Sequence, residues 1–199
     1  WSQESKAACI KAADKILEGN IIWFSNEQYL VSEIPNWFFD PFSKSFYEGE
    51  NLHWSNCKHF QKADIKRFWE LSRHVWGPLL ARAFRLSKNK KYLKKLNSCN
   101  RDWCFKNPVN QGVNWSCGQE ISIRLLHSML TWIIMEYPND FPENSTQREE
   151  FVYAHLNRIS FSRHYASAQQ NNHWISESAA LYIGGSWLVK VNSIYKSSG

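Results

Sequence analysis

The chain has 199 residues, of which 43% are hydrophobic, enough for one domain with a sizeable core. It has no apolar run long enough to cross a bilayer, so we expect no membrane span. The formal net charge of +6 favours a polyanionic partner, either nucleic acid or an acidic polysaccharide. Many of the 11 Trp, 12 Phe and 8 Tyr residues belong in a core, but a sugar-binding cleft also uses such a surplus.

The five cysteines form no CxxC pair and no Cys/His zinc pattern, so the sequence predicts no metal site, and it indicates no cofactor. Their odd number leaves at least one unpaired within the chain, and disulfide bonds are possible without being required. The chain begins at Trp1 without an apolar signal segment, and we therefore expect a piece of a longer protein. No signal in the sequence fixes the oligomeric state.

The first sixty residues combine one helix with an irregular segment. Residues 3–18 carry apolar side chains at helical spacing and predict an amphipathic helix that Gly19 ends. Residues 20–60 are aromatic, β-branched and interrupted by prolines, and we expect extended pieces and loops that cover a helical body. From Ala63 to Ala83 the apolar spacing again predicts a helix, with a kink or break at Gly77-Pro78.

The middle of the chain is also helical. Five lysines between Lys88 and Lys95 indicate a solvated helix face, with a phosphate or glycan site as the minor alternative. The helix through 96–105 must end before Pro108. Residues 113–136 predict one helix whose centre, 121–135, is apolar nearly all round, and such a helix is buried on every side.

The last two helices complete the predicted fold. A capping box at Thr146–Glu149 opens a helix to about Tyr165. The final helix follows residues 169–178 and carries Gly184-Gly185, which indicates close packing or an early end. The pattern therefore predicts an all-α chain of six to seven antiparallel helices, a single domain over 1–199, with minor extended segments confined to 20–60.

Residues 169–173, Gln-Gln-Asn-Asn-His, lead directly into this last apolar helix. Asn is a preferred N-cap, so one interpretation is a capped helix with a histidine in its first turn. Free N–H groups and the helix dipole also favour an anion at such a terminus. We favour this second interpretation, in which the stretch neutralises a substrate carboxylate without a metal.

Three clusters occur in order, with helical spacing between them. They are Asp64-Ile65-Lys66-x-x-Trp69-Glu70-x-x-Arg73, Asn107-Pro108-x-x-x-Gly112-x-Asn114-Trp115-x-x-x-x-Glu120-x-x-x-Arg124, and Asn171-Asn172-His173-x-x-x-Glu177-x-x-x-Leu181. Each also has a plain structural interpretation, such as an ion pair between Glu70 and Arg73 or between Glu120 and Arg124. Together they resemble the N-terminal helical domain of the heparinase II/III-like polysaccharide lyases, over roughly residues 50–190.

This resemblance implies an incomplete (α/α) toroid followed by a β-sandwich domain, acting in the bacterial periplasm or outside the cell. It also implies cleavage of a uronic-acid-containing acidic polysaccharide by β-elimination. Asn172 and His173 match the carboxylate-neutralising pair, with proton transfer as the alternative role of His173. The resemblance implies substrate-binding residues near the cleft, where Trp115 could stack on a sugar; these are Asn114, Trp115, Glu120, Arg124, Asn171 and Glu177.

The family's catalytic tyrosine lies some tens of residues beyond the Asn-His pair. The resemblance therefore implies that the catalytic set is incomplete within residues 1–199, and we expect this chain to be inactive alone. We also expect the helix starts after Gly112 and Gln170 to face one concave surface. The predicted lining of that surface is Asn114, Trp115, Asn172 and His173.

Three other functions remain open. A non-catalytic acidic-glycan-binding domain is the main alternative. A toroid glycoside hydrolase would need two cleft carboxylates, for which Glu120 and Glu177 are the available pair. Nucleic-acid binding through the net charge and Lys88–Lys95 lacks a helix-turn-helix, zinc or RNP signature, and we expect no nucleic-acid partner.

Overall fold

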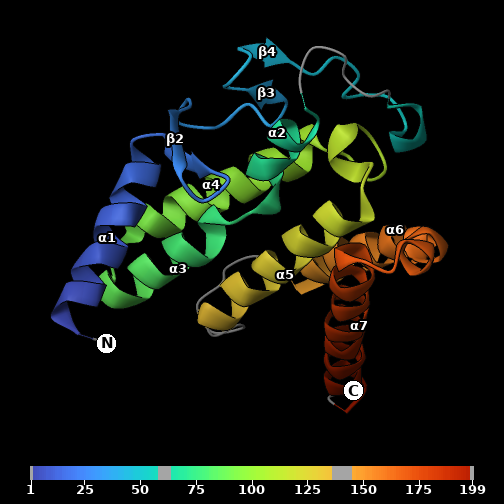
Figure 1. The fold of residues 1–199 in the computed structure, drawn as a ribbon. Coiled ribbons are helices and arrows are strands. Elements are labelled where there is room, and N and C mark those ends of the chain that lie inside the picture. Colours follow the sequence, from blue (N-terminus) through green and yellow to red (C-terminus); the bar gives the residue numbers. More distant parts are fainter. Residues whose placement is uncertain (1, 58–63, 136–144, 198–199) are drawn as a thin grey trace.

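A computed structural model describes residues 2–57, 64–135 and 145–197 of the chain. The described part is mostly helical with little strand, which confirms the predicted helical class. Figure 1 shows α1, α3 and α4 grouped on one side and α5, α6 and α7 on the other. Helix α5 joins the two groups, because it packs against α3 as well as against α6 and α7. The predicted helix start at Ala63 and the loop prolines Pro138 and Pro142 lie outside the described residues.

The N-terminal region follows the prediction closely. Helix α1 (Gln3–Leu17) ends just before Gly19, which has a φ of +84° and whose added Cβ would overlap the Val31 carbonyl oxygen. Two short antiparallel hairpins follow within residues 20–60; they are β1 (Asn20–Trp23) with β2 (Glu27–Leu30), and β3 (Phe39–Asp40) with β4 (Ser45–Phe46). The buried Trp23 ties the first hairpin to the helical body, since its Nε1 donates to the Arg67 carbonyl oxygen at 3.1 Å.

The predicted break at Gly77-Pro78 lies at His74 instead. Helix α2 (Lys66–Trp69) continues as a 3₁₀ turn to Arg73, His74 adopts a left-handed φ of +59°, and α3 spans Trp76–Ser87. Pro78 is therefore the third residue of α3, where the N–H that proline lacks has no intrahelical partner in any case. Gly77 is needed for packing, because a Cβ there would lie 2.7 Å from Thr131 Oγ1 of α5.

Helix α4 (Lys90–Lys106) carries the lysine run. Asn89 caps its start by accepting from the Lys91 N–H, and the helix ends before Pro108 as predicted. Most of the lysines are solvent-exposed, which confirms the predicted solvated face. Lys95 is the exception: it is buried, and its Nζ donates to the Glu33 carbonyl oxygen.

The prediction of one helix over 113–136 is wrong in two respects. A 3₁₀ turn (Val113–Trp115) comes first, the extended Cys117 follows, and only then does α5 (Gly118–Ile134) begin. The helix is also not buried on every side, because Leu130 and Ile133 are exposed, the latter by 69%. Its neighbours α3, α6 and α7 leave one strip of its surface uncovered.

Helices α6 (Ser145–Gln169) and α7 (Asn172–Ser197) are joined by a tight turn at Gln170, with a φ of +45°. Helix α6 begins one residue before the predicted cap at Thr146. Of the two interpretations of Gly184-Gly185, close packing is confirmed at Gly184 alone, since a Cβ at Gly185 would meet nothing within 4 Å, and an early helix end is wrong. A Cβ at Gly184 would lie 2.8 Å from Leu156 Cδ2 of α6, while α7 continues beyond both glycines.

Candidate functional site

The His173 pocket has a volume of about 500 Å³ and lies where the starts of α5 and α7 approach the middle of α6. The segment around Trp54 and the residues Ile65 and Trp69 close its other side. Aromatic, cationic and hydroxyl side chains therefore converge on one cavity. Those used below are Trp54, Arg158, Ser162, Tyr165 and His173.

His173 is held by a buried carboxylate one helical turn away. Its Nδ1 lies 3.1 Å from Glu177 Oε1, and Glu177, only 2% exposed, also accepts at Oε2 from Ser162 Oγ at 3.0 Å. An ionised carboxylate only accepts hydrogen bonds, so it fixes the proton of His173 on Nδ1. The Nε2 atom then remains for a ligand or a proton in the pocket. Glu177 thus contacts His173 and Ser162 in this structure, and its implied role in substrate binding stays a prediction.

The start of α5 is shaped to fit this pair. A Cβ at Gly118 would overlap Ser162 Oγ and lie 2.7 Å from Glu177 Oε1. Only a residue without a side chain leaves room for the hydrogen bonds between α6 and α7 at this point. Gly118 therefore sets the distance between the start of α5 and the Glu177 carboxylate.

Arg158 supplies the cation of the His173 pocket. Its Nε and Nη2 atoms each donate at 2.9 Å, to the carbonyl oxygens of Trp115 and Ser116. Its guanidinium lies 3.6 Å from the centre of the Trp54 ring. Burial lowers its pKa to about 10, so the group stays charged at neutral pH. Its Nη1 is buried and unpaired among the described residues, a donor arrangement suited to an anion.

The two asparagines before His173 have different tasks. Asn171 Oδ1 accepts from the His173 N–H at 3.0 Å, so Asn171 is the residue that caps α7. Asn172 is the first residue of the helix, and its side chain is exposed. Within the described part of the chain, the Asn172 side chain makes no hydrogen bond. The cap and the available amide donor are therefore separate residues, which the sequence alone did not reveal.

The prediction that Asn114 and Trp115 share a concave surface with His173 is wrong. Both are only 1% exposed. Asn114 Nδ2 donates to Asn107 Oδ1 at 2.9 Å, and Trp115 Nε1 donates to the Asn107 carbonyl oxygen at 3.2 Å. Trp115 contributes to a different pocket, and its buried ring offers no open face for stacking on a sugar. The 3₁₀ turn before α5 directs these side chains inward.

Glu120 and Arg124 do not pair with each other as the spacing suggested. Arg73 donates through Nε and Nη2 to the two Glu120 oxygens at 2.6 and 2.8 Å, and through Nη1 to Glu70. Arg124 is buried, and its Nε donates to His155 Nε2 at 2.9 Å. Burial lowers the pKa of Arg124 to about 9. Glu120 is thus held in a structural ion pair, which disfavours a hydrolase that uses it as a cleft carboxylate.

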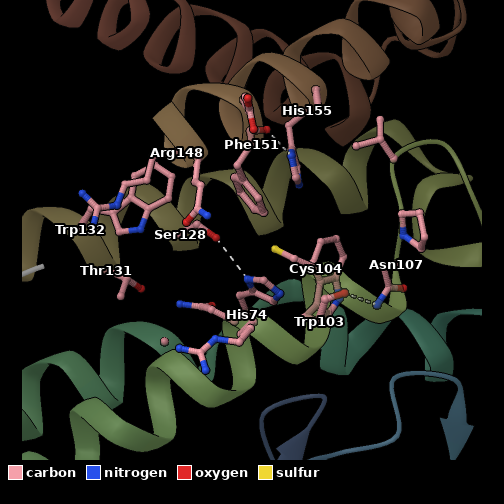
Figure 2. A pocket seen from close by; sticks show the side chains of 18 of the residues that line it. His74, Trp103, Cys104, Asn107, Ser128, Thr131, Trp132, Arg148, Phe151 and His155 are labelled. Atoms are coloured by element: carbon pink, nitrogen blue, oxygen red, sulfur yellow. Dashed lines mark hydrogen bonds between the residues drawn. The ribbon is translucent and has the colours of Figure 1, made fainter. Parts of the chain in front are cut away.

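A second cavity, the Trp103 pocket, lies between α3, α4, α5 and α6 and has a volume of about 550 Å³ (Figure 2). Two buried histidines, His74 and His155, belong to its wall. Burial is the largest cause that lowers both imidazole pKa values well below 6.5, and the charge of Arg124 lowers them further. Both rings are therefore neutral at neutral pH.

These histidines predict a loss of stability in mild acid. The unfolded chain takes up protons at both residues below about pH 6.5, while the folded chain does not. Stability is therefore fully present above this pH and falls below it, by up to about 1.4 kcal/mol per pH unit for each histidine. Urea unfolding between pH 7 and pH 5.5 measures the slope, and His155→Gln should make it shallower. A flat profile would contradict the burial of these rings.

Residues 14–193 match the family described as Heparinase II/III N-terminus. The chain belongs to this family. A curated heparin-sulfate lyase of Bacteroides stercoris is 23% identical over 115 residues, which are 56% of this chain and 17% of that protein. The matched part thus spans about a sixth of the length of this relative. No solved structure matches the chain.

Several residues of this heparinase II/III N-terminal region were missed at the sequence level. Arg158, Ser162 and Tyr165 lie at i, i+4 and i+7 on α6, which places them on one helix face. This spacing was the signal that could have identified them. The structure also places the Arg158 guanidinium over the Trp54 ring, a contact that the sequence did not indicate.

The described residues include no group of three or more His, Cys, Asp or Glu side chains that could hold a metal ion. All five cysteines are free thiols. Within the same part of the chain, no helix combines the length and the apolar character that a bilayer span requires.

Proposed function

We propose that residues 1–199 form a single helical domain of a polysaccharide lyase, and that the lyase cleaves a uronic-acid-containing acidic polysaccharide by β-elimination. In this proposal the domain binds the polymer in the His173 pocket. The heparin-sulfate lyase relative supports an acidic polysaccharide as the substrate class. The longer enzyme completes an (α/α) toroid around the pocket and adds a β-sandwich domain. Because a polymer does not cross membranes freely, the enzyme acts in the periplasm or outside the cell.

The observation that carries the proposal is the His173–Glu177–Ser162 chain of contacts beside the unpaired Arg158 donor. Removing the proton α to a carboxylate builds negative charge on that carboxylate, which positioned donors must stabilise. The start of α7 supplies such donors, as does the Asn172 amide, which is exposed and adjoins His173 without belonging to the pocket lining. Arg158 supplies a full positive charge. His173 Nε2 accepts a hydrogen bond from the reacting group or takes up a proton from it.

β-Elimination needs two proton movements: one from the ring carbon and one to the departing glycosidic oxygen. His173 supplies at most one of these groups. In this proposal, the second is a tyrosine in sequence beyond residue 199, as the family resemblance implies. Tyr165, whose ring centre lies 5.8 Å from that of His173, is the other tyrosine to test, since it lies in the same pocket.

The alternative is a domain that binds acidic glycans without cleaving them. The stacked Arg158 and Trp54 favour it, because a guanidinium and an aromatic ring suffice to hold an acidic sugar. Under this alternative, His173 contributes a hydrogen bond and no proton transfer.

A binding assay on residues 1–199 tests the pocket. We expect heparan sulfate oligosaccharides to bind in calorimetry, and no unsaturated product to appear in absorbance. Arg158→Gln should weaken binding at least about 10-fold, since it removes a charge-assisted hydrogen bond. Lys94→Gln is the matched control, because it removes one exposed charge on α4.

Melting temperatures of both variants report any effect of the lost Arg158 contacts on the fold. Equal losses of affinity in the two variants would assign binding to the lysine face and reject the His173 pocket. Rapid turnover by residues 1–199 would show that the catalytic set is already complete.

A further inference from the structure

The Trp103 pocket takes no part in the proposed function. We infer that it is a second binding site, for a single sugar ring that carries an acidic substituent. The inference depends on the lining of this pocket and not on the proposed lyase chemistry. Its volume of about 550 Å³ falls within the roughly 300–1,000 Å³ of small-molecule sites.

Aromatic side chains form much of the wall. Trp103, Trp132 and Phe151 come from three different helices, α4, α5 and α6, and Figure 2 shows them around the cavity. Trp103 and Phe151 pack edge to face at 6.2 Å, and Trp132 packs against Phe151 in the same way at 6.0 Å. These contacts hold the three rings in place. Trp103 is only 1% exposed and backs the wall, so the apolar C–H face of a pyranose would pack on Trp132 and on the partly exposed Phe151.

His74 supplies an unused polar group in this wall. Its Nδ1 lies 3.2 Å from Ser128 Oγ, while its Nε2 is buried and has no partner among the described residues. Leaving a buried nitrogen unsatisfied costs about 1–3 kcal/mol. A sugar hydroxyl would satisfy it, as donor or acceptor, according to the tautomer of the neutral imidazole. A purely apolar ligand would leave this cost in place.

The charges around the cavity favour an acidic substituent. Arg101 is exposed at the pocket, Arg148 belongs to its wall, and Glu150 is the opposing charge. A further cation lies behind the aromatic wall, where the Arg124 guanidinium is 4.4 Å from the centre of the Trp103 ring. A carboxylate or sulfate on the ring is therefore attracted, whereas a cationic ligand is repelled.

The two pockets are separate sites divided by a thin wall. Trp115 lines the Trp103 pocket while the next residue, Ser116, lines the His173 pocket. On α6, His155 and Arg158 lie one turn apart and likewise face different cavities. Changes in one pocket can thus be made without altering the lining of the other.

Calorimetric titration of residues 1–199 with D-glucuronate and with D-glucose tests the inference. We expect both to bind and glucuronate to bind more tightly. The indole N–H signals of Trp103 and Trp132 should shift in NMR spectra, with those of Trp54 and Trp69 reporting on the His173 pocket. His74→Asn should weaken both sugars about 5- to 10-fold, the loss of one buried hydrogen bond. Asn tolerates the left-handed backbone of His74.

Arg101→Gln should weaken glucuronate about 2- to 5-fold and leave glucose unchanged. Because Arg101 is exposed, this variant stays informative even if His74→Asn lowers the melting temperature. Lys106→Gln, an exposed charge on the same helix, is the matched control and should change neither affinity. Failure of both sugars to shift the Trp103 and Trp132 signals would overturn the inference. Binding of indole but of neither sugar would overturn it as well.

Discussion

Replacing Asn172 by alanine in a form of the protein that cleaves polyuronate should lower kcat about 10²–10³-fold, roughly 3–4 kcal/mol. KM should change little, because only interactions gained in the transition state accelerate the chemical step. The substitution should not disturb the fold, since the Asn172 side chain is exposed and its loss removes no contact within the described residues. Stability should therefore stay near that of the unchanged protein. Initial rates of unsaturated-product formation and a melting curve measure the two effects.

Asn171→Ala is the matched control for that experiment. Asn171 accepts from the His173 N–H, so its loss removes the helix cap and should cost about 1 kcal/mol of stability. Its kcat should stay near wild type. If Asn172→Ala instead lowers the melting temperature and leaves turnover unchanged, the two roles are reversed and the site assignment fails. Similar losses of kcat in both variants would indicate that the helix start acts as a unit.

Glu120→Ala should produce the largest loss of stability, about 3 kcal/mol. Removing one partner of a buried ion pair leaves an uncompensated charge, which typically costs about 3–5 kcal/mol. We expect the lower end of this range because Arg73 keeps its contact with Glu70. The Arg73 side chain is also 22% exposed, so solvent screens part of its charge. Urea unfolding gives the free-energy difference directly.

Glu27→Ala, a change at an exposed residue of β2, is the control and should alter stability by no more than about 0.5 kcal/mol. The same variants also test the substrate-binding role implied for Glu120 by family resemblance. A Glu120→Ala protein that keeps its unfolding free energy but loses affinity for acidic oligosaccharides would show that Glu120 binds substrate. A less stable protein with unchanged affinity would assign it to the scaffold.

The sequence by itself determined the features that depend on neighbouring residues. The bounds of α1 and the end of α4 follow from apolar spacing, a glycine stop and a proline limit, all of which act within a turn or two. The ordered motifs around Trp69, Trp115 and His173 were sufficient for the family, which the match over residues 14–193 confirms. The helix start at His173 was likewise visible, since capping chemistry is local.

Only the tertiary structure decided which side chains meet. Arg73 and Glu120 are 47 residues apart, so no periodicity could favour this pair over the helical spacing of Glu120 and Arg124. The break at His74 also depends on packing, because α3 must approach α5 closely enough for Gly77 to contact Thr131. Trp115 and His173 face different cavities for the same reason. Local pattern fixes the face of a helix, but the neighbouring helices decide whether that face is core or pocket wall.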